Sequence, residues 1–401
     1  MKEGATTRRG QEGADRRAEM LRLVQGGMPI SEAWRAVGGA GEGSYRKARA
    51  NHPQWAALVT EAAARHRQVE LRPGQTYEKL SHSDWSKLFC HRSHLAHQVE
   101  IAEALDRTEP GEMTLFNLWP GAGKSSVVVD WVTRKLAEDP DHRIMYVSES
   151  SKLVSDFVSQ IQKRMTNQST VRLPGGEDGD FSLLVSMYGP FYEPGQERRS
   201  KRPWGASEFT VARSTRDEKD PSIAAYAISS VAYGSRADTL IVDDVQSQRS
   251  LSQTEKVLKT LRTTYFNRGT PSRPLRIFVI GTRIGRGDIY EALLDEGIVD
   301  HKVELSATVF DPGRGRFVPR SPAAWLLGNP KFDLDSMSSD EMLEAAIVVM
   351  DRQRRRVGEE AWWANYEQAP MTVALSTFGE ALDGCLDSTR RIGRLVLGEA
   401  A

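Results

Sequence analysis

The chain has 401 residues, of which 39% are hydrophobic and 27% charged, a composition of globular rather than fibrous or disordered proteins. Its 54 Lys and Arg balance its 54 Asp and Glu, so DNA contact would need a local patch or an assembled ring. Two cysteines, Cys90 and Cys385, exclude a disulfide framework, and the lack of a long apolar run or a secretory signal predicts a cytoplasmic protein with no membrane partner.

Residues 1–70 predict a small all-α module. Apolar residues at helical spacing over 18–24 stop at a glycine pair, a second helix is expected over 30–38, and a third begins near Ser44. Short helices joined by glycine turns are typical of a helix-turn-helix, and 12 Lys and Arg against 8 Asp and Glu favour a DNA-facing surface. A plain three-helix packing or adaptor module fits the same pattern. The polar residues 71–84 predict a linker.

Residues 85–310 predict an α/β domain with a mainly parallel sheet flanked by helices. Apolar runs alternate there with longer amphipathic stretches, the pattern of strands connected by helices. The runs expected as buried strands are 113–118, 143–147, 239–242 and 275–280. Residues 166–222, rich in Gly, Pro and charge, predict an excursion from the sheet. The basic cluster at 197–202 within it is either a solvated loop or a surface for DNA phosphates.

The strongest local signal is Trp119-Pro-Gly-Ala-Gly-Lys-Ser-Ser126, which lies between a predicted strand and a predicted helix. A loop of this kind points backbone N–H groups inward, and the helix N-terminus adds partial positive charge, so the loop can hold nucleotide phosphates. The usual pattern starts with glycine where this chain has Leu118, which makes it a variant form. The residues expected around ATP are Pro120, Gly121, Ala122, Gly123, Lys124, Ser125 and Ser126.

Within this loop, Lys124 is expected to reach the β- and γ-phosphates and Ser125 to bind Mg²⁺. Two carboxylates follow the predicted strand 239–242. Such a pair suits a nucleotide hydrolase, in which Asp243 is expected to bind the metal ion and Asp244 to activate the attacking water. The side chain of Asp244 is shorter than the glutamate that many such enzymes use, and a strand-end pair that caps a turn is the alternative.

A further predicted strand, 275–280, is followed by Thr282. At the carboxyl edge of a parallel sheet this hydroxyl is placed to contact the γ-phosphate and to report its hydrolysis. Arg283 and Arg286 follow in the same loop. They are either donors of positive charge, in their own site or a neighbour's, or solvent-exposed loop arginines. Residues 311–401 predict a helical C-terminal extension.

In their order, these stretches resemble the large motor subunit of the terminase of tailed bacteriophages. The resemblance covers about residues 85–395 and is carried by residues 94–105, 119–126, 143–150, 234–244, 281–289 and 362–370. It implies a RecA-like P-loop ATPase that forms a homo-oligomeric ring on the portal protein of a procapsid, in the host cytoplasm, and drives double-stranded DNA inward. A small terminase subunit is the further implied partner.

The same resemblance assigns Lys124 and Ser125 to ATP and Mg²⁺, Asp243 to the metal, Asp244 to water activation and Thr282 to coupling. The position of Gln98 suggests a contact with adenine. One departure is that residues 120–122 hold no arginine, whereas many members of the family carry one in this loop.

The other departure concerns the end of the chain. In the family an RNase H-like nuclease with two-metal carboxylates normally follows the motor. Here Asp383 and Asp387, four residues apart, fit one face of a helix and are expected at the surface. The expectation is therefore that this chain does not cut DNA and that a separate nuclease does.

Two other functions remain open on the sequence. One is another RecA-like DNA-dependent ATPase such as a helicase, although residues 300–401 show no second series of strands and helices for a second motor lobe. The other is a DNA-binding adaptor whose nucleotide fold binds ATP without hydrolysing it.

Overall fold

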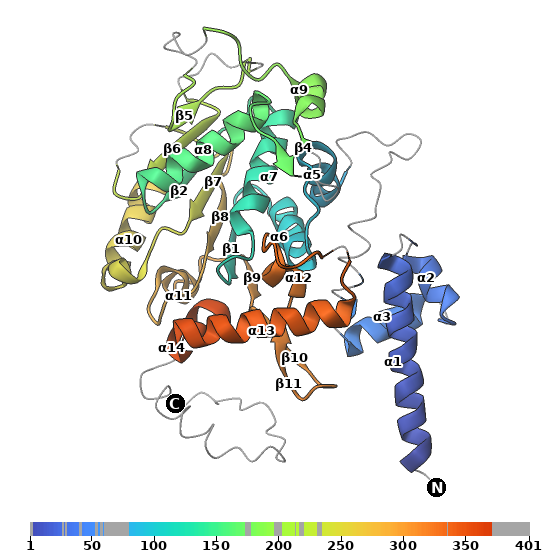
Figure 1. Cartoon of the computed structure of the whole chain (residues 1–401). Helices are drawn as coiled ribbons and strands as arrows, with labels where there is room; N and C mark the ends of the chain where they lie inside the picture. The colour runs from blue at the N-terminus through green and yellow to red at the C-terminus, as the bar shows by residue number, and fades with distance from the viewer. Residues whose placement is uncertain are drawn as a thin grey trace.

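The structure is a computed structural model that describes residues 3–25, 28, 30–39, 42–52, 55–56, 59, 80–172, 178–195, 203–212, 214–215, 220–230, 235–334 and 336–370. The basic cluster at 197–202 and the late residues Asp383, Cys385 and Asp387 lie outside these ranges, as do residues 71–79 of the predicted linker. Figure 1 shows a small group of N-terminal helices and a larger α/β body.

A seven-stranded sheet forms the centre of this body, in the order β5-β6-β2-β7-β8-β1-β9. Its strands are β1 (Met113–Leu118), β2 (Ile144–Ser148), β5 (Glu208–Phe209), β6 (Ile223–Ala227), β7 (Thr239–Asp243), β8 (Arg276–Gly281) and β9 (His301–Leu305). Neighbouring strands are parallel except β5, which runs antiparallel to β6. Every residue of β1, β2 and β7 is buried, which explains their continuous apolar runs.

Helices cover both faces of the sheet (Figure 1). One apolar cluster joins the sheet to the helices α5 (His82–Cys90), α6 (Ala96–Arg107), α7 (Lys124–Glu138) and α8 (Ser151–Met165). A second cluster joins the opposite face to α10 (Thr254–Thr260), η4 (Leu261–Tyr265) and α11 (Ile289–Asp295). This arrangement confirms the predicted fold class, a mainly parallel sheet flanked by helices. The first residues of α5 fall within the stretch expected to be a linker.

The N-terminal region is helical, as predicted. It contains α1 (Glu3–Gln25), α2 (Ile30–Ala36) and α3 (Glu42–Asn51), and its first helix begins well before the predicted residue 18. Its own apolar cluster is built around Trp34 and Trp55, whose rings lie 6.1 Å apart. Across the described part of the chain, we find no helix that combines the length and apolar character required to cross a bilayer.

Shorter elements complete the chain. Between α8 and β7 the excursion holds β3 (Val171–Arg172), β4 (Asp178–Gly179) and α9 (Ser182–Tyr188), and η3 (Gln248–Gln253) follows β7. The C-terminal part adds a hairpin of β10 (Thr308–Asp311) and β11 (Arg316–Pro319), then α12 (Pro322–Leu326), α13 (Ser339–Val357), α14 (Glu359–Ala361) and η5 (Trp362–Tyr366). Most of the described residues of this extension are helical, but a strand of the hairpin lies where only helices were expected.

Candidate nucleotide-binding site

The order of the strands brings three predicted motifs to one edge of the sheet. β8 lies between β1 and β7, with Asn117 paired to Gly281 and Asp243 paired to Ile280. The three parallel strands therefore end at nearly the same level. Because the carboxyl ends of parallel strands form one crevice, the loop after β1, the acids after β7 and Thr282 after β8 all face it.

The loop after β1 has the backbone that a phosphate-binding turn needs. Gly123, with φ of 80°, is the N-cap of α7, and a Cβ on it would lie 2.2 Å from Nε2 of Gln98. Both the left-handed backbone and the close neighbour require glycine. No side chain caps the N-terminus of α7, so its first N–H groups remain available to bind an anion inside the loop. Pro120 and Gly121 are exposed at the turn, and Ala122 is buried.

Lys124, the first residue of α7, is buried and points back toward the sheet. Its Nζ donates to the carbonyl oxygen of Leu118 at 3.4 Å and to Oγ1 of Thr282. The Thr282 hydroxyl in turn donates to the same carbonyl at 2.8 Å. The structure thus connects the predicted phosphate lysine directly to the predicted coupling residue that follows β8.

The carboxylate of Asp243 lies at the end of β7 and is only 4% exposed. Tyr146 donates a hydrogen bond of 2.9 Å to Oδ2, while Oδ1 has no hydrogen-bond partner in the described ranges. Burial raises the pKa of Asp243 above its usual range, and the negative charge of Asp244 raises it further. The charge of Lys124 and the hydroxyls of Tyr146 and Ser125 act in the opposite direction. These effects place the loop residues within electrostatic reach of the acid.

Asp244 follows in an uncommon backbone conformation. Its φ is 42°, in the left-handed region that Asp tolerates better than most residues. Its N–H donates to the carbonyl oxygen of Ile280 at 3.0 Å, which extends the β7–β8 pairing by one residue. This contact turns the chain sharply at the crevice and keeps Asp244 beside Gly281.

The residues present suit a magnesium ion. Mg²⁺ prefers oxygen ligands and usually takes one or two protein carboxylates, with phosphates and water completing its shell. Asp243 offers a buried oxygen with no hydrogen bond, and Ser125 is exposed at the start of α7. In the described ranges, no group of three or more His, Cys, Asp or Glu is placed to hold a metal by itself.

Two side chains of α6 support the loop from behind. Gln98 donates from Nε2 to the carbonyl oxygen of Ala122 at 3.1 Å and accepts at Oε1 from the N–H of Leu95 at 3.0 Å. His97 hydrogen-bonds through Nε2 to the same carbonyl of Ala122 at 2.8 Å. Both ends of the Gln98 amide are therefore bonded to backbone. The contact of Gln98 with adenine stays a prediction, and the role of His97 was not foreseen.

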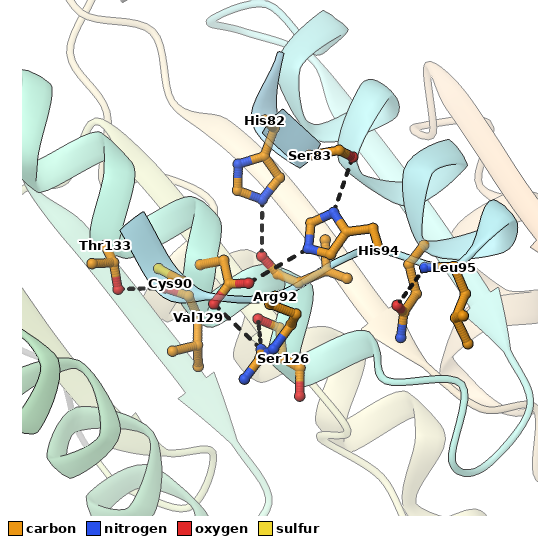
Figure 2. Close-up of polar contacts among 12 residues, drawn as sticks. His82, Ser83, Cys90, Arg92, His94, Leu95, Ser126, Val129 and Thr133 are labelled. Atoms are coloured by element: carbon orange, nitrogen blue, oxygen red, sulfur yellow. Dashed lines mark hydrogen bonds and ion pairs between the residues drawn. The ribbon is translucent and has the colours of Figure 1, made fainter. Parts of the chain in front are cut away.

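A buried ionic network fixes the first turns of α7. Asp130 is fully buried and is paired with Arg164, with Nη1 of Arg92 at 3.3 Å and with Nε2 of His94 at 3.5 Å. Although burial opposes its ionisation, these partners hold the pKa of Asp130 below its usual range. Arg92 also donates to the carbonyl oxygen of Ser126 at 2.8 Å (Figure 2). The network ties the end of the phosphate loop to α8, and its members carry no motif that would reveal it in the sequence.

The two loop arginines after β8 differ in their surroundings. Arg283 is buried, with Nε 2.8 Å from Asp288 and Nη2 2.7 Å from Glu291. Its N–H donates to Oε1 of Gln368 at 3.1 Å, which joins this loop to the C-terminal extension. Arg286 is exposed, and we find no ion pair for it in the described ranges. Only Arg286 is therefore available to a neighbouring molecule.

β8 thus separates the phosphate-loop strand β1 from the acidic strand β7, and all three strands end at one crevice. No protein-family model matches the sequence, and no curated protein matches it. A similar solved structure is the crystal structure of the HK97 bacteriophage large terminase, with a TM-score of 0.37 and 14% identity. The match covers 68% of this chain and 49% of that one, so this chain spans about half the length of that terminase.

Proposed function

We propose that the chain is a viral DNA-packaging ATPase, the motor part of a terminase large subunit, which couples ATP hydrolysis to movement of double-stranded DNA into a procapsid. The observation that carries the ATPase proposal is the meeting of Lys124, Asp243 and Thr282 at one sheet edge. The order of motifs along the chain, which resembles the terminase motor, supports the packaging role.

The site suits ATP because its parts match the charges of a triphosphate. The phosphates would lie against the amides of residues 121–125 and the N-terminus of α7, with Lys124 beside the β- and γ-phosphates. Ser125 and Asp243 would hold Mg²⁺, whose positive charge offsets the negative charge that develops on the phosphates. Binding of the phosphates would draw Lys124 away from Thr282, which gives the strand β8 a way to sense the nucleotide.

Hydrolysis needs a base for the attacking water. In this proposal Asp244 orients the water and accepts its proton while the water oxygen bonds to the γ-phosphorus. The bond from that phosphorus to the oxygen bridging to ADP breaks, which leaves ADP and inorganic phosphate. Thr282 then no longer contacts a γ-phosphate, and its hydrogen bond with Lys124 forms again.

The packaging role implies partners that the resemblance supplies. They are double-stranded DNA, the portal protein of the procapsid, a small terminase subunit and further copies of this chain in a ring. Within such a ring the exposed Arg286 is a candidate to reach a neighbour's nucleotide, because it lies in the loop after β8 at the nucleotide edge.

ATP hydrolysis by the purified chain, with and without double-stranded DNA, tests the proposal. We expect DNA to raise turnover, and Lys124→Ala and Asp243→Ala each to lower it at least about 100-fold, as losses of charge-stabilising groups do. Lys152→Ala and Asp156→Ala are matched controls, because this exposed ion pair of α8 lies outside the site and contributes little.

The outcomes separate the alternatives. Wild-type turnover in both Lys124→Ala and Asp243→Ala would refute the ATPase assignment. ATP binding by the wild type without turnover would favour the adaptor. Separation of DNA strands during hydrolysis would favour a helicase.

A further inference from the structure

Tyr290 of α11 places its phenol directly against the end of β8. The side chain is 1% exposed, and a Cβ on Gly281 would lie only 1.7 Å from its hydroxyl oxygen. Gly281 is the last residue of β8 and precedes Thr282. The hydroxyl therefore reaches the carboxyl edge of the sheet, from the face opposite α7.

This hydroxyl has no hydrogen-bond partner among the residues that the structure describes. Buried polar groups are nearly always bonded, and an unbonded one is unfavourable for folding. Phenylalanine would fill the same space without that cost. Packing alone therefore does not explain the oxygen atom.

The carboxylates around Tyr290 are Asp243, Asp244 and Asp288. Asp288 is bonded to Arg283 and to the N–H of Glu291. Asp243 accepts from Tyr146 at Oδ2, and its unbonded Oδ1 is assigned to Mg²⁺ in the proposed function. Asp244 is the remaining candidate acceptor, because its side chain makes no hydrogen bond within the described ranges. Its backbone is fixed next to Gly281 by the bond to Ile280.

Burial raises the pKa of Tyr290 well above its usual value, and the charge of Asp244 adds to this effect. The phenol is therefore protonated at neutral pH and is a donor with no acceptor. Asp244 is the converse case, because its carboxylate is an acceptor with no donor. This carboxylate is carried by a short side chain on a left-handed backbone.

We propose that Tyr290 is a positioning residue: its hydroxyl, unbonded in this structure, donates a hydrogen bond to the carboxylate of Asp244 when nucleotide occupies the site and holds that carboxylate toward the attacking water. The inference rests on the proposed function, because it gives Asp244 the role of the base. The position of the phenol requires glycine at residue 281, because any side chain there would displace the phenol.

Tyr290→Phe tests the inference. We expect kcat to fall about tenfold to 100-fold, nucleotide affinity to stay within about twofold, and the melting temperature to be equal or higher because an unbonded hydroxyl is removed. The matched control is Tyr265→Phe, on the same face of the sheet, whose hydroxyl donates to the carbonyl oxygen of Ser230 at 3.1 Å. That variant should show a lower melting temperature and an unchanged kcat.

A second variant keeps the test independent of Tyr290 itself. Gly281→Ala should displace the phenol and lower both kcat and the melting temperature. In an Asp244→Asn background, Tyr290→Phe should cause no further loss, because the two residues act through one step.

Each result has one reading. If Lys124→Ala abolishes hydrolysis and Tyr290→Phe turns over like the wild type, the positioning role is overturned and the ATPase stands. Reduced stability together with weak nucleotide binding in Tyr290→Phe would assign the tyrosine to packing and also overturn the role. Wild-type hydrolysis by Lys124→Ala and Asp243→Ala would instead remove the proposed function, and this inference with it.

Discussion

Tyr146 on β2 donates a 2.9 Å hydrogen bond to Oδ2 of Asp243 on the neighbouring strand β7. The phenol is held in place by Phe157 of α8, whose ring is stacked on it at 3.8 Å. Asp243 is therefore oriented from inside the protein, and only its Oδ1 is left for a ligand in the crevice. A partner behind a metal ligand commonly tunes the affinity for the metal.

Removal of this hydroxyl should weaken magnesium binding. We expect Tyr146→Phe to raise the Mg²⁺ concentration needed for half-maximal hydrolysis about tenfold, in line with the loss of a hydrogen bond behind a metal ligand. Binding of Mn²⁺ in the presence of ADP, followed by electron paramagnetic resonance, measures the same loss without turnover. Tyr226→Phe is the control, because within the described ranges its hydroxyl hydrogen-bonds to Ser235 at 3.3 Å and not to Asp243. Equal metal affinity in the two variants would contradict the role of Tyr146.

Thr282→Val should separate binding from turnover. Valine has nearly the same shape but cannot accept from Lys124 or donate to Leu118. Because the loop itself is unchanged, we expect ATP to bind within about threefold of the wild type while kcat falls at least about tenfold, a loss typical of one hydrogen bond to a charged group. Rescue by Thr282→Ser would show that the hydroxyl matters. A loss of binding equal to the loss of kcat would place Thr282 in nucleotide binding instead.

Gln98→Ala should weaken the binding of all nucleotides alike. Its amide supports the carbonyl of Ala122, so its loss loosens the loop whatever base is bound. Competition between ATP and GTP for a fluorescent nucleotide measures the effect: we expect both affinities to fall by the same factor, about threefold to tenfold for one hydrogen bond. A fall for ATP with GTP unchanged would favour the contact with adenine that the sequence suggested.

The strands that could be predicted from the sequence are those with continuous apolar runs. Strands buried on both faces, such as β1 and β7, read as unbroken hydrophobic segments, and the loop and acids at their ends could be assigned from them. Three strands of the sheet escaped this signal for different reasons. β5 has only two residues. β6 is built largely from alanine, and β9 is an edge strand whose residues are mostly exposed or half-buried.

The polar contacts behind the site could not be predicted in the same way. Tyr146 and Asp243 are separated by 97 residues, and Arg92 and Asp130 by 38. Each partner is an ordinary tyrosine or arginine in its own stretch of sequence. Only the strand order and the packing of α7 bring them together, so their roles follow from tertiary structure alone.

Acid should destabilise the fold through His97, which packs at 4.7 Å against Trp119 under the phosphate loop. Burial lowers the pKa of His97 to about 4, compared with 6.5 for an ordinary histidine. The unfolded chain therefore takes up a proton first, so this stability is complete above pH 6.5 and is lost as the pH falls toward 4. The loss amounts to about 3 kcal/mol at 1.4 kcal/mol per pKa unit.

Urea unfolding at pH 7, 6 and 5 measures this dependence. In His97→Gln, whose amide can still donate to Ala122, the free energy of unfolding should fall less steeply with acid, by up to about 1.4 kcal/mol per pH unit. His82, with its pKa lowered to about 3 by burial, adds a slope that stays in both proteins. An unchanged slope in His97→Gln would mean that this histidine is protonated equally in the folded and unfolded chains.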